Sequence, residues 1–181
     1  MILLDPDLEP HPAPPVRAAK RTGASGLPVS PRRQRLPSAR TLARYLALAQ
    51  AAVRLRGQVT VLLTTNAAIR RLNRQFRGKN KATDVLSFPA EGVGAEQIAG
   101  DLAISVPTAL RQAIERGHSL STEVKVLMLH GLLHLAGYDH ETDTGQMARR
   151  ERLLRARLGL PHGLIERTHT PSPRRSRGVR P

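Results

Sequence analysis

The most apolar segment of the chain, residues 126–140 (VLMLHGLLHLAGYDH), carries three of its seven histidines: His130, His134 and His140. Ser121 or Thr122 is a suitable N-cap for a helix through this segment, and Gly137 a suitable left-handed end. An imidazole among apolar side chains costs free energy unless it finds a partner. The fold must therefore satisfy these histidines, either as hydrogen-bonded core residues or as ligands of a metal ion.

The spacing of the three histidines favours a metal site. On a helix, His130 and His134 are about 40° and roughly 6 Å apart, so both side chains project from one face. A turn at Gly137 can bring His140 to a third vertex of a zinc ion. Three neutral ligands leave one tetrahedral position open, which is typical of catalytic rather than structural zinc. Pairs at this spacing also arise by chance, so two satisfied core histidines stay the alternative.

Metalloproteases of the H-E-x-x-H type place their general-base glutamate directly after the first histidine. In this chain that residue is Gly131. A zinc-dependent peptidase of that design is therefore disfavoured, and it ranks third among the functions considered.

Alternating strand and helix patterns predict an α/β or α+β fold with a single mixed sheet and about five helices. A helix is expected from Ser38 to Gly57, and Asn66 is the expected N-cap of a second helix in which Ile69, Leu72 and Phe76 face inward. The remaining predicted elements are strands at 58–65, 85–89 and 100–106, a helix from Pro107 to Gly117, and a last helix from Glu141 with Met147, Leu153, Leu154 and Leu158 as its inner face.

The length of 181 residues suggests one folded domain, placed at residues 26–162. Residues 1–25 are rich in Pro and Arg and are predicted to form a flexible extension, and residues 163–181 a disordered basic tail. The absence of cysteine excludes disulfides and any Cys-based zinc site. No apolar run is long enough for a membrane span and no signal peptide is visible, so a cytoplasmic protein is expected.

A formal net charge of +15 points to a polyanionic partner, RNA or DNA before a membrane. Six basic residues crowd into RRLNRQFRGKNK at 70–81. Arg74, Arg77, Lys79 and Lys81 are the candidate RNA contacts, although a solvated helix face also explains Arg74. Arg77 and Lys79 flank Gly78, where backbone and guanidinium can both approach a phosphate. With four aromatic residues in the chain, base stacking is not expected to be the main mode of recognition.

HGLLHLAGYDH, together with FRGKNKATDVLSFP and GDLAIS upstream, resembles the bacterial YbeY family of rRNA maturation factors. The resemblance runs from about Gln58 to Leu160. It implies a zinc metallohydrolase-like fold with one Zn²⁺ on His130, His134 and His140. It also implies a single-strand-specific endoribonuclease acting in 16S rRNA 3′-end maturation and ribosome quality control. The implied partners are rRNA and the small ribosomal subunit, with ribosomal proteins or an assembly GTPase as further ones.

Carried over by position, Arg77 matches the arginine needed for activity, so Arg77 and His130 are the catalytic candidates. The general base stays open between hydroxide on the metal and a carboxylate such as Asp84. Asp84 and Asp139 are candidates to orient an imidazole from outside the ligand set, and Asp139 serves equally well as a cap for the last helix. A non-enzymatic ribosome assembly factor with a mainly structural zinc is the second function considered.

Overall fold

The computed structural model describes residues 1–8, 35–90, 97–140 and 142–161. These residues form an α+β fold with one mixed four-stranded sheet and five helices, as the sequence predicts. The elements in chain order are β1 (Ile2–Leu4), α1 (Ala39–Val53), β2 (Gln58–Thr64), α2 (Asn66–Arg77), β3 (Val85–Pro89), β4 (Ile98–Ser105), α3 (Val106–Arg116), α4 (Leu120–Leu135) and α5 (Gln146–Arg157).

The strand order in the sheet is β1-β2-β4-β3. β1, β2 and β4 run parallel, and β3 pairs antiparallel with β4 so that Ser87 lies opposite Leu102. Within the described residues, β1 and β3 are therefore the two edges. β3 is the edge strand against which α4 packs, so it is the part of the sheet closest to the histidine segment.

The strand at the amino terminus corrects the prediction of a flexible extension over residues 1–25. Ile2–Leu4 pairs with β2, and the amino group of Met1 donates to the carbonyl oxygen of Val59. A strand of three residues is too short to show an alternating pattern, and its partner lies about 58 positions further along the chain. Residues 9–25 lie outside the described part of the chain.

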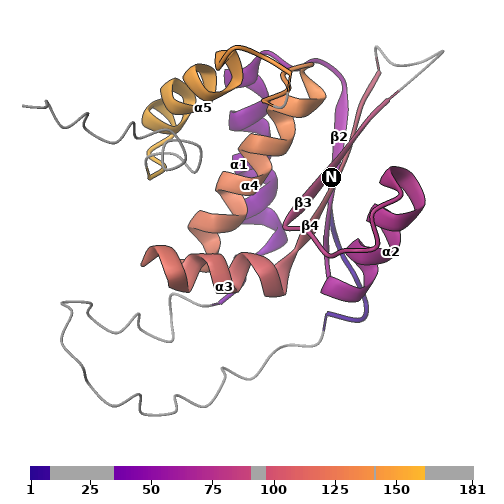
Figure 1. The fold of residues 1–181 in the computed structure, drawn as a ribbon. Helices are drawn as coiled ribbons and strands as arrows, with labels where there is room; N and C mark the ends of the chain where they lie inside the picture. The colour runs from indigo at the N-terminus through magenta and orange to yellow at the C-terminus, as the bar shows by residue number, and fades with distance from the viewer. Residues whose placement is uncertain (9–34, 91–96, 141, 162–181) are drawn as a thin grey trace, which may run out of the picture.

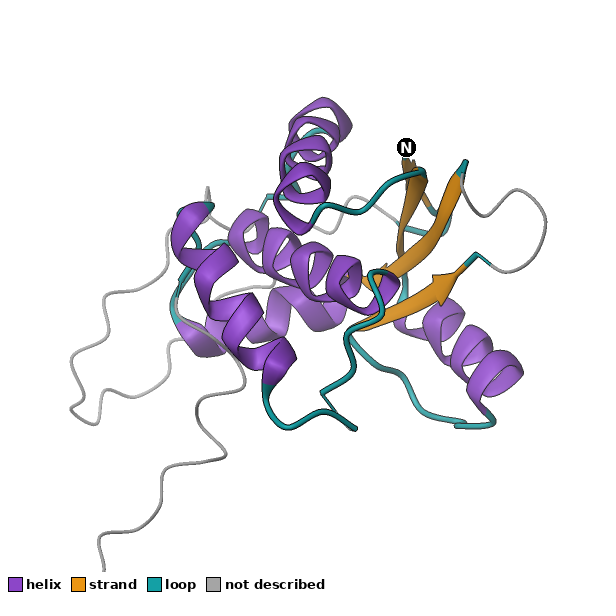
Figure 2. Ribbon diagram, turned by 90° about the horizontal axis from the view of Figure 1, so that it is seen from above, coloured by secondary structure: helices purple, strands orange, loops and turns teal. Residues whose placement is uncertain are grey.

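The two faces of the sheet are covered unequally. α1, α4 and α5 lie on one side and α2 on the other, and Figure 2 shows most helices gathered on one side of the strands. Alternation along β4 follows this division, because Leu102 and Ile104 join the large core while Ala103 joins Ile69 and Leu86 beneath α2. The sheet thus separates a large core from a small one.

α4 is buried along most of its length because its residues are apolar on nearly every side. Its N-cap is Ser119, whose hydroxyl accepts from Thr122 N–H, two residues before the earlier of the two predicted caps. Gly137 follows the helix in the left-handed conformation at φ +85°, as predicted, and Tyr138 N–H donates to the Leu133 carbonyl at 3.0 Å. The chain therefore turns back directly after His134.

Two helix boundaries differ from the prediction. α1 ends at Val53 with Arg54 in the left-handed conformation, because its N–H bonds back to the carbonyls of Gln50 and Ala51. Gly57 is needed for a different reason: at φ +90°, a Cβ there would lie 2.8 Å from the backbone nitrogen of Ala99. For α2 the N-cap is Thr65 rather than Asn66.

α5 begins at Gln146 rather than Glu141. The preceding residues form a turn in which the Asp143 carboxylate accepts from the N–H groups of Gly145 and Met147. Met147 and Leu154 are buried as predicted, whereas Leu153 is 63% exposed. In the described part of the chain, no helix is both long and apolar enough to span a bilayer.

Candidate metal centre

The predicted histidine triad comes together at the end of α4. His130 and His134 project from the last two turns of the helix, and His140 follows the turn at Gly137. One ligand nitrogen from each of the three lies within 4.8 Å of the others, a grouping that could hold a metal ion. His130 and His134 are half-buried, and His140 is exposed.

The spacing of the ligand nitrogens fits a tetrahedral ion. The Nε2 atoms of His130 and His134 are 3.2 Å apart. Two nitrogens bound to one tetrahedral zinc at its usual bond length are separated by about 3.3–3.4 Å. Two imidazole nitrogens would not approach so closely by chance packing alone unless they share a proton or a metal. A donor set of three imidazoles also suits zinc and its transition-metal neighbours.

The environment keeps His134 in the neutral form that binds metal. Burial, followed by the nearby His130 and His140, lowers the pKa of His134 to about 4, against an ordinary 6.5. The negative charge of Asp139 opposes this shift in the pKa of His134, and the positive charge of Arg77 adds to it. At neutral pH a metal therefore does not compete with the additional proton of a charged imidazolium at His134.

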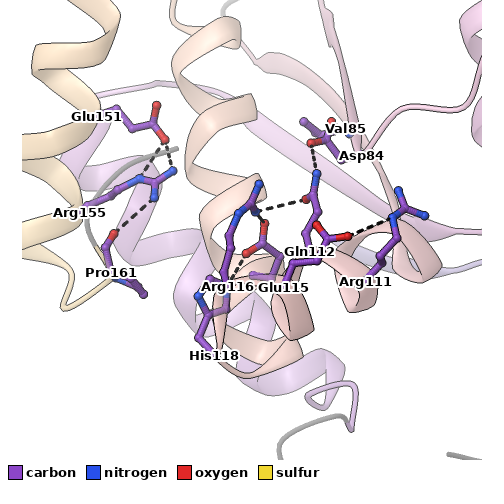
Figure 3. A network of polar contacts seen from close by, with 11 residues as sticks. Asp84, Val85, Arg111, Gln112, Glu115, Arg116, His118, Glu151, Arg155 and Pro161 are labelled. Atoms are coloured by element: carbon purple, nitrogen blue, oxygen red, sulfur yellow. Dashed lines mark hydrogen bonds and ion pairs between the residues drawn. The ribbon is translucent and has the colours of Figure 1, made fainter. Parts of the chain in front are cut away.

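Glu151 of α5 fixes the orientation of His130. The His130 Nδ1 donates to Glu151 Oε2 at 3.3 Å, which leaves Nε2 free to face the other two histidines. Burial alone would raise the pKa of Glu151, but the hydrogen bond from His130 and the charge of Arg155 together lower it. Arg155 Nε donates to Glu151 Oε1 at 2.9 Å, and its guanidinium also reaches the Pro161 carbonyl (Figure 3). Carboxylate-to-histidine contacts of this kind orient metal ligands.

The sequence analysis did not find Glu151. The signal was present, because Glu151 lies one turn after Met147 and one turn before Arg155, on the buried stripe of α5. An acid and a base at i, i+4 on an apolar stripe have to satisfy each other or something else in the core. What the sequence does not reveal is that this stripe packs against the histidines of α4.

Asp84 and Asp139, the two carboxylates predicted to orient an imidazole, have different hydrogen-bond partners. Asp84 Oδ1 accepts from Val85 N–H at 2.8 Å and from the Thr83 hydroxyl at 3.1 Å, and Asp84 Oδ2 accepts from Gln112 Nε2 of α3 at 3.0 Å (Figure 3). These contacts do not support the expectation that Asp84 orients an imidazole. The charge of Asp139 tends to raise the pKa of His134, and its carboxylate accepts from the Thr142 hydroxyl at 3.1 Å.

The close packing of α4 against the sheet explains why position 131 is a glycine, which the sequence alone does not show. A Cβ at this position would lie 2.7 Å from Leu102 Cδ2 and 3.2 Å from Ser87 Oγ. The Ser87 hydroxyl donates to the Gly131 carbonyl at 3.3 Å. The glycine thus lets α4 approach β3 and β4 closely at the level of the metal ligands, and a glutamate there would have no space.

The predicted RNA contacts lie together at the end of α2 and in the following loop. Arg74, Arg77, Lys79 and Lys81 are all exposed. Gly78 ends the helix at φ +67°, and the loop is held by Asn73, whose side-chain amide donates to the Lys81 carbonyl at 2.7 Å. The basic cluster, meaning these four residues, is thus a fixed surface whose Arg77 acts electrostatically on His134.

Fold and site together define an α+β protein with a three-histidine group that could hold a metal ion and with an exposed basic cluster. The family model described as Endoribonuclease YbeY matches residues 34–159. The chain belongs to this family.

Similar proteins carry the same description. An Endoribonuclease YbeY of Koribacter versatilis is 53% identical over 135 residues, which cover 75% of this chain and 87% of the relative. One from Solibacter usitatus is 57% identical over 109 residues, covering 60% and 71%. The solution structure of TM1509 from Thermotoga maritima matches with a TM-score of 0.48 and 28% identity, over 68% of this chain and 85% of that one.

Proposed function

We propose that this protein is a zinc-dependent endoribonuclease that cleaves single-stranded RNA at the histidine centre. The observation that carries the proposal is the position of the three imidazoles: two are oriented by α4 with Nε2 atoms 3.2 Å apart, and one of these is held by a buried carboxylate. Relatives described as endoribonucleases support the same class of reaction.

The residues around the centre have separate roles in this proposal. His130, His134 and His140 would hold a zinc ion, which would supply Lewis-acid activation of water and of the phosphodiester. Arg77 binds a phosphate oxygen of the substrate and offsets the negative charge that develops in the transition state. Lys79 and Lys81 position the RNA backbone, and Glu151 keeps His130 in the orientation that ligation needs.

We place the activity in the maturation of the 16S rRNA 3′ end and in ribosome quality control, with rRNA and the small ribosomal subunit as partners in the cytoplasm. The net charge of +15 and membership of the family support this assignment. A substrate that is both polyanionic and single-stranded at its processing site suits an exposed basic cluster next to the centre.

The test measures metal content and RNA cleavage on the same purified samples. The variants are wild type, His134→Ala and Arg77→Ala, with Arg111→Ala as the matched control because this arginine is also exposed and lies on α3. The substrates are a 16S rRNA precursor with an extended 3′ end, a short unpaired RNA and its duplex. We expect wild type to hold about one zinc and to cut the unpaired RNA, with zinc removal and replacement abolishing and restoring cleavage.

His134→Ala should lose both zinc and cleavage, whereas Arg77→Ala should keep zinc and cut at least about 100-fold more slowly. Arg111→Ala should match wild type. Full cleavage by metal-free protein, or by Arg77→Ala, would contradict the proposed roles. Precursor binding without cleavage by zinc-loaded wild type would instead favour the non-enzymatic assembly factor.

A further inference from the structure

Phe76, in the last turn of α2, is a large apolar side chain that the fold leaves open. It is 58% exposed, although the sequence pattern predicted it to face inward with Ile69 and Leu72. Ile69 is fully buried and Leu72 half-buried, so burial along this stripe decreases towards the carboxyl end of the helix. An exposed aromatic ring in a fixed place is a surface on which something can bind.

The ring is supported rather than loose. Phe88 of β3 packs against it in an edge-to-face arrangement, with the ring centroids 5.1 Å apart and the planes at 67°. Phe88 is itself half-buried and belongs to the small core beneath α2. Aromatic pairs of this geometry are favourable, so the partner holds Phe76 without covering it.

The surroundings of Phe76 are strongly positive. Arg74, Arg77 and Lys79 are exposed within three positions of it, and residues 66–83 contain no acidic residue at all. A purely apolar protein partner would gain nothing from these cations. A nucleic-acid strand needs both parts of such a surface, since its phosphates pair with the cations and its unpaired bases stack on an aromatic face.

Phe76 and the metal centre are linked through the same strand. Phe88 supports Phe76 on one face of β3, while its neighbour Ser87 bonds the carbonyl of Gly131, which lies between two of the metal ligands, on the other face. The aromatic ring and the histidines therefore flank one edge strand.

We propose that Phe76 is a stacking platform for one unpaired base of the RNA that binds at the metal centre. This inference rests on the proposed function and adds a contact to it. Because the platform and the centre are both fixed to β3, a base stacked on Phe76 sets the position of the strand relative to the cut. The contact requires an unpaired base, so it also contributes to selection of single-stranded over duplex RNA.

The test uses the zinc-loaded, full-length protein and a short single-stranded RNA in which an abasic site is introduced at each position in turn. Affinity is measured by fluorescence anisotropy at several salt concentrations, and the cleavage position is mapped on the same RNAs. The variants are Phe76→Ala, Phe76→Leu, which keeps apolar contact with Phe88, and Phe76→Trp, which keeps a stacking face. Leu48→Ala is the matched control, since Leu48 is 63% exposed on α1.

We expect Phe76→Ala and Phe76→Leu to weaken RNA binding about tenfold, and Phe76→Trp to bind like wild type. The slope of affinity against salt should not change, because no phosphate contact is lost. In wild type, one abasic position should weaken binding by about the same factor, and this position should have no effect in Phe76→Leu. Thermal unfolding of all variants shows whether each is folded.

Wild-type affinity in Phe76→Leu, or a profile of abasic effects identical in wild type and variant, would overturn the stacking role. In either case RNA binding and cleavage by wild type would leave the proposed function standing. Wild-type protein that neither binds nor cuts unpaired RNA would overturn both the stacking role of Phe76 and the proposed function.

Discussion

Replacing Glu151 by leucine should destabilise the protein severely, because the change leaves Arg155 as a buried charge without its carboxylate. Arg155 is 2% exposed, and its Nε lies 2.9 Å from Glu151 Oε1. Removing one partner of a buried ion pair typically costs about 3–5 kcal/mol. Domains of this size are stable by only about 5–15 kcal/mol, so the single variant should lose between about a fifth and all of its free energy of unfolding.

The double variant Glu151→Leu/Arg155→Met separates the structural and metal-binding roles of Glu151. Apolar residues of similar volume can replace a buried ion pair with little loss of stability, so most of the free energy of unfolding should return. Metal affinity should not return, because the Nδ1 of His130 still lacks its acceptor. Loss of such a contact typically lowers metal affinity by about 10- to 100-fold.

Urea denaturation of metal-free protein measures the first effect, and zinc competition against a chromophoric chelator measures the second. Glu151→Leu within about 1 kcal/mol of wild type would show that the pair is not buried as the structure describes it. Wild-type zinc affinity in the double variant would show that Glu151 does not orient His130. Loss of stability in the double variant equal to that in the single one would refute the argument that the stranded charge of Arg155 is the cause.

Three further predictions concern stability. Gly131→Ala should lower the free energy of unfolding by about 1 kcal/mol or more, since overpacking against Leu102 outweighs the gain in helix propensity; a more stable variant in urea denaturation would contradict this. Metal-free protein should lose stability as pH falls from 6.5 towards 4. Over this range His134 binds a proton in the unfolded chain but not in the folded protein. The variant His134→Asn should therefore show a weaker dependence of stability on pH. Glu123→Ala should lower the free energy of unfolding by about 1–3 kcal/mol, measured by calorimetry, without changing zinc affinity. The reason is that fully buried Glu123 pairs with Arg116 and His118, which keep partial access to water. An unchanged melting temperature would refute this.

The grouping of the three histidines was predictable because their arrangement is local. Two histidines one helical turn apart and a third just after a glycine stop are determined by helix geometry and one left-handed residue. Glu151 was not predictable in the same way, since its contact with His130 joins residues 21 positions apart in different helices. That contact depends on how α5 packs against α4, which periodicity within either helix does not specify.

Periodicity also failed to predict burial where a helix extends past the part of the sheet that covers it. Phe76 continues the stripe of Ile69, but the stripe predicts which side of α2 faces the sheet and not how far the sheet covers it. The strand at Ile2–Leu4 was missed for a related reason, because its identity comes from pairing with Val61–Leu63 and not from its own three residues. In both cases the deciding contacts are between segments that are distant in the sequence.

Among the described helices, the most apolar one, α4, carries two of the three histidines that could hold a metal ion. Burial explains how the apolar surroundings and the ligand role fit together. An imidazole removed from water loses its tendency to bind a proton, so its nitrogen stays available to a metal at neutral pH. A bare buried imidazole would be costly, and Glu151 reduces that cost for His130 by accepting its Nδ1–H. Gly131 then lets the same helix turn approach β3, the strand that bears Phe88 on its other face. The position of α4 therefore favours the neutral form of His134 and brings the histidine segment against β3 at once.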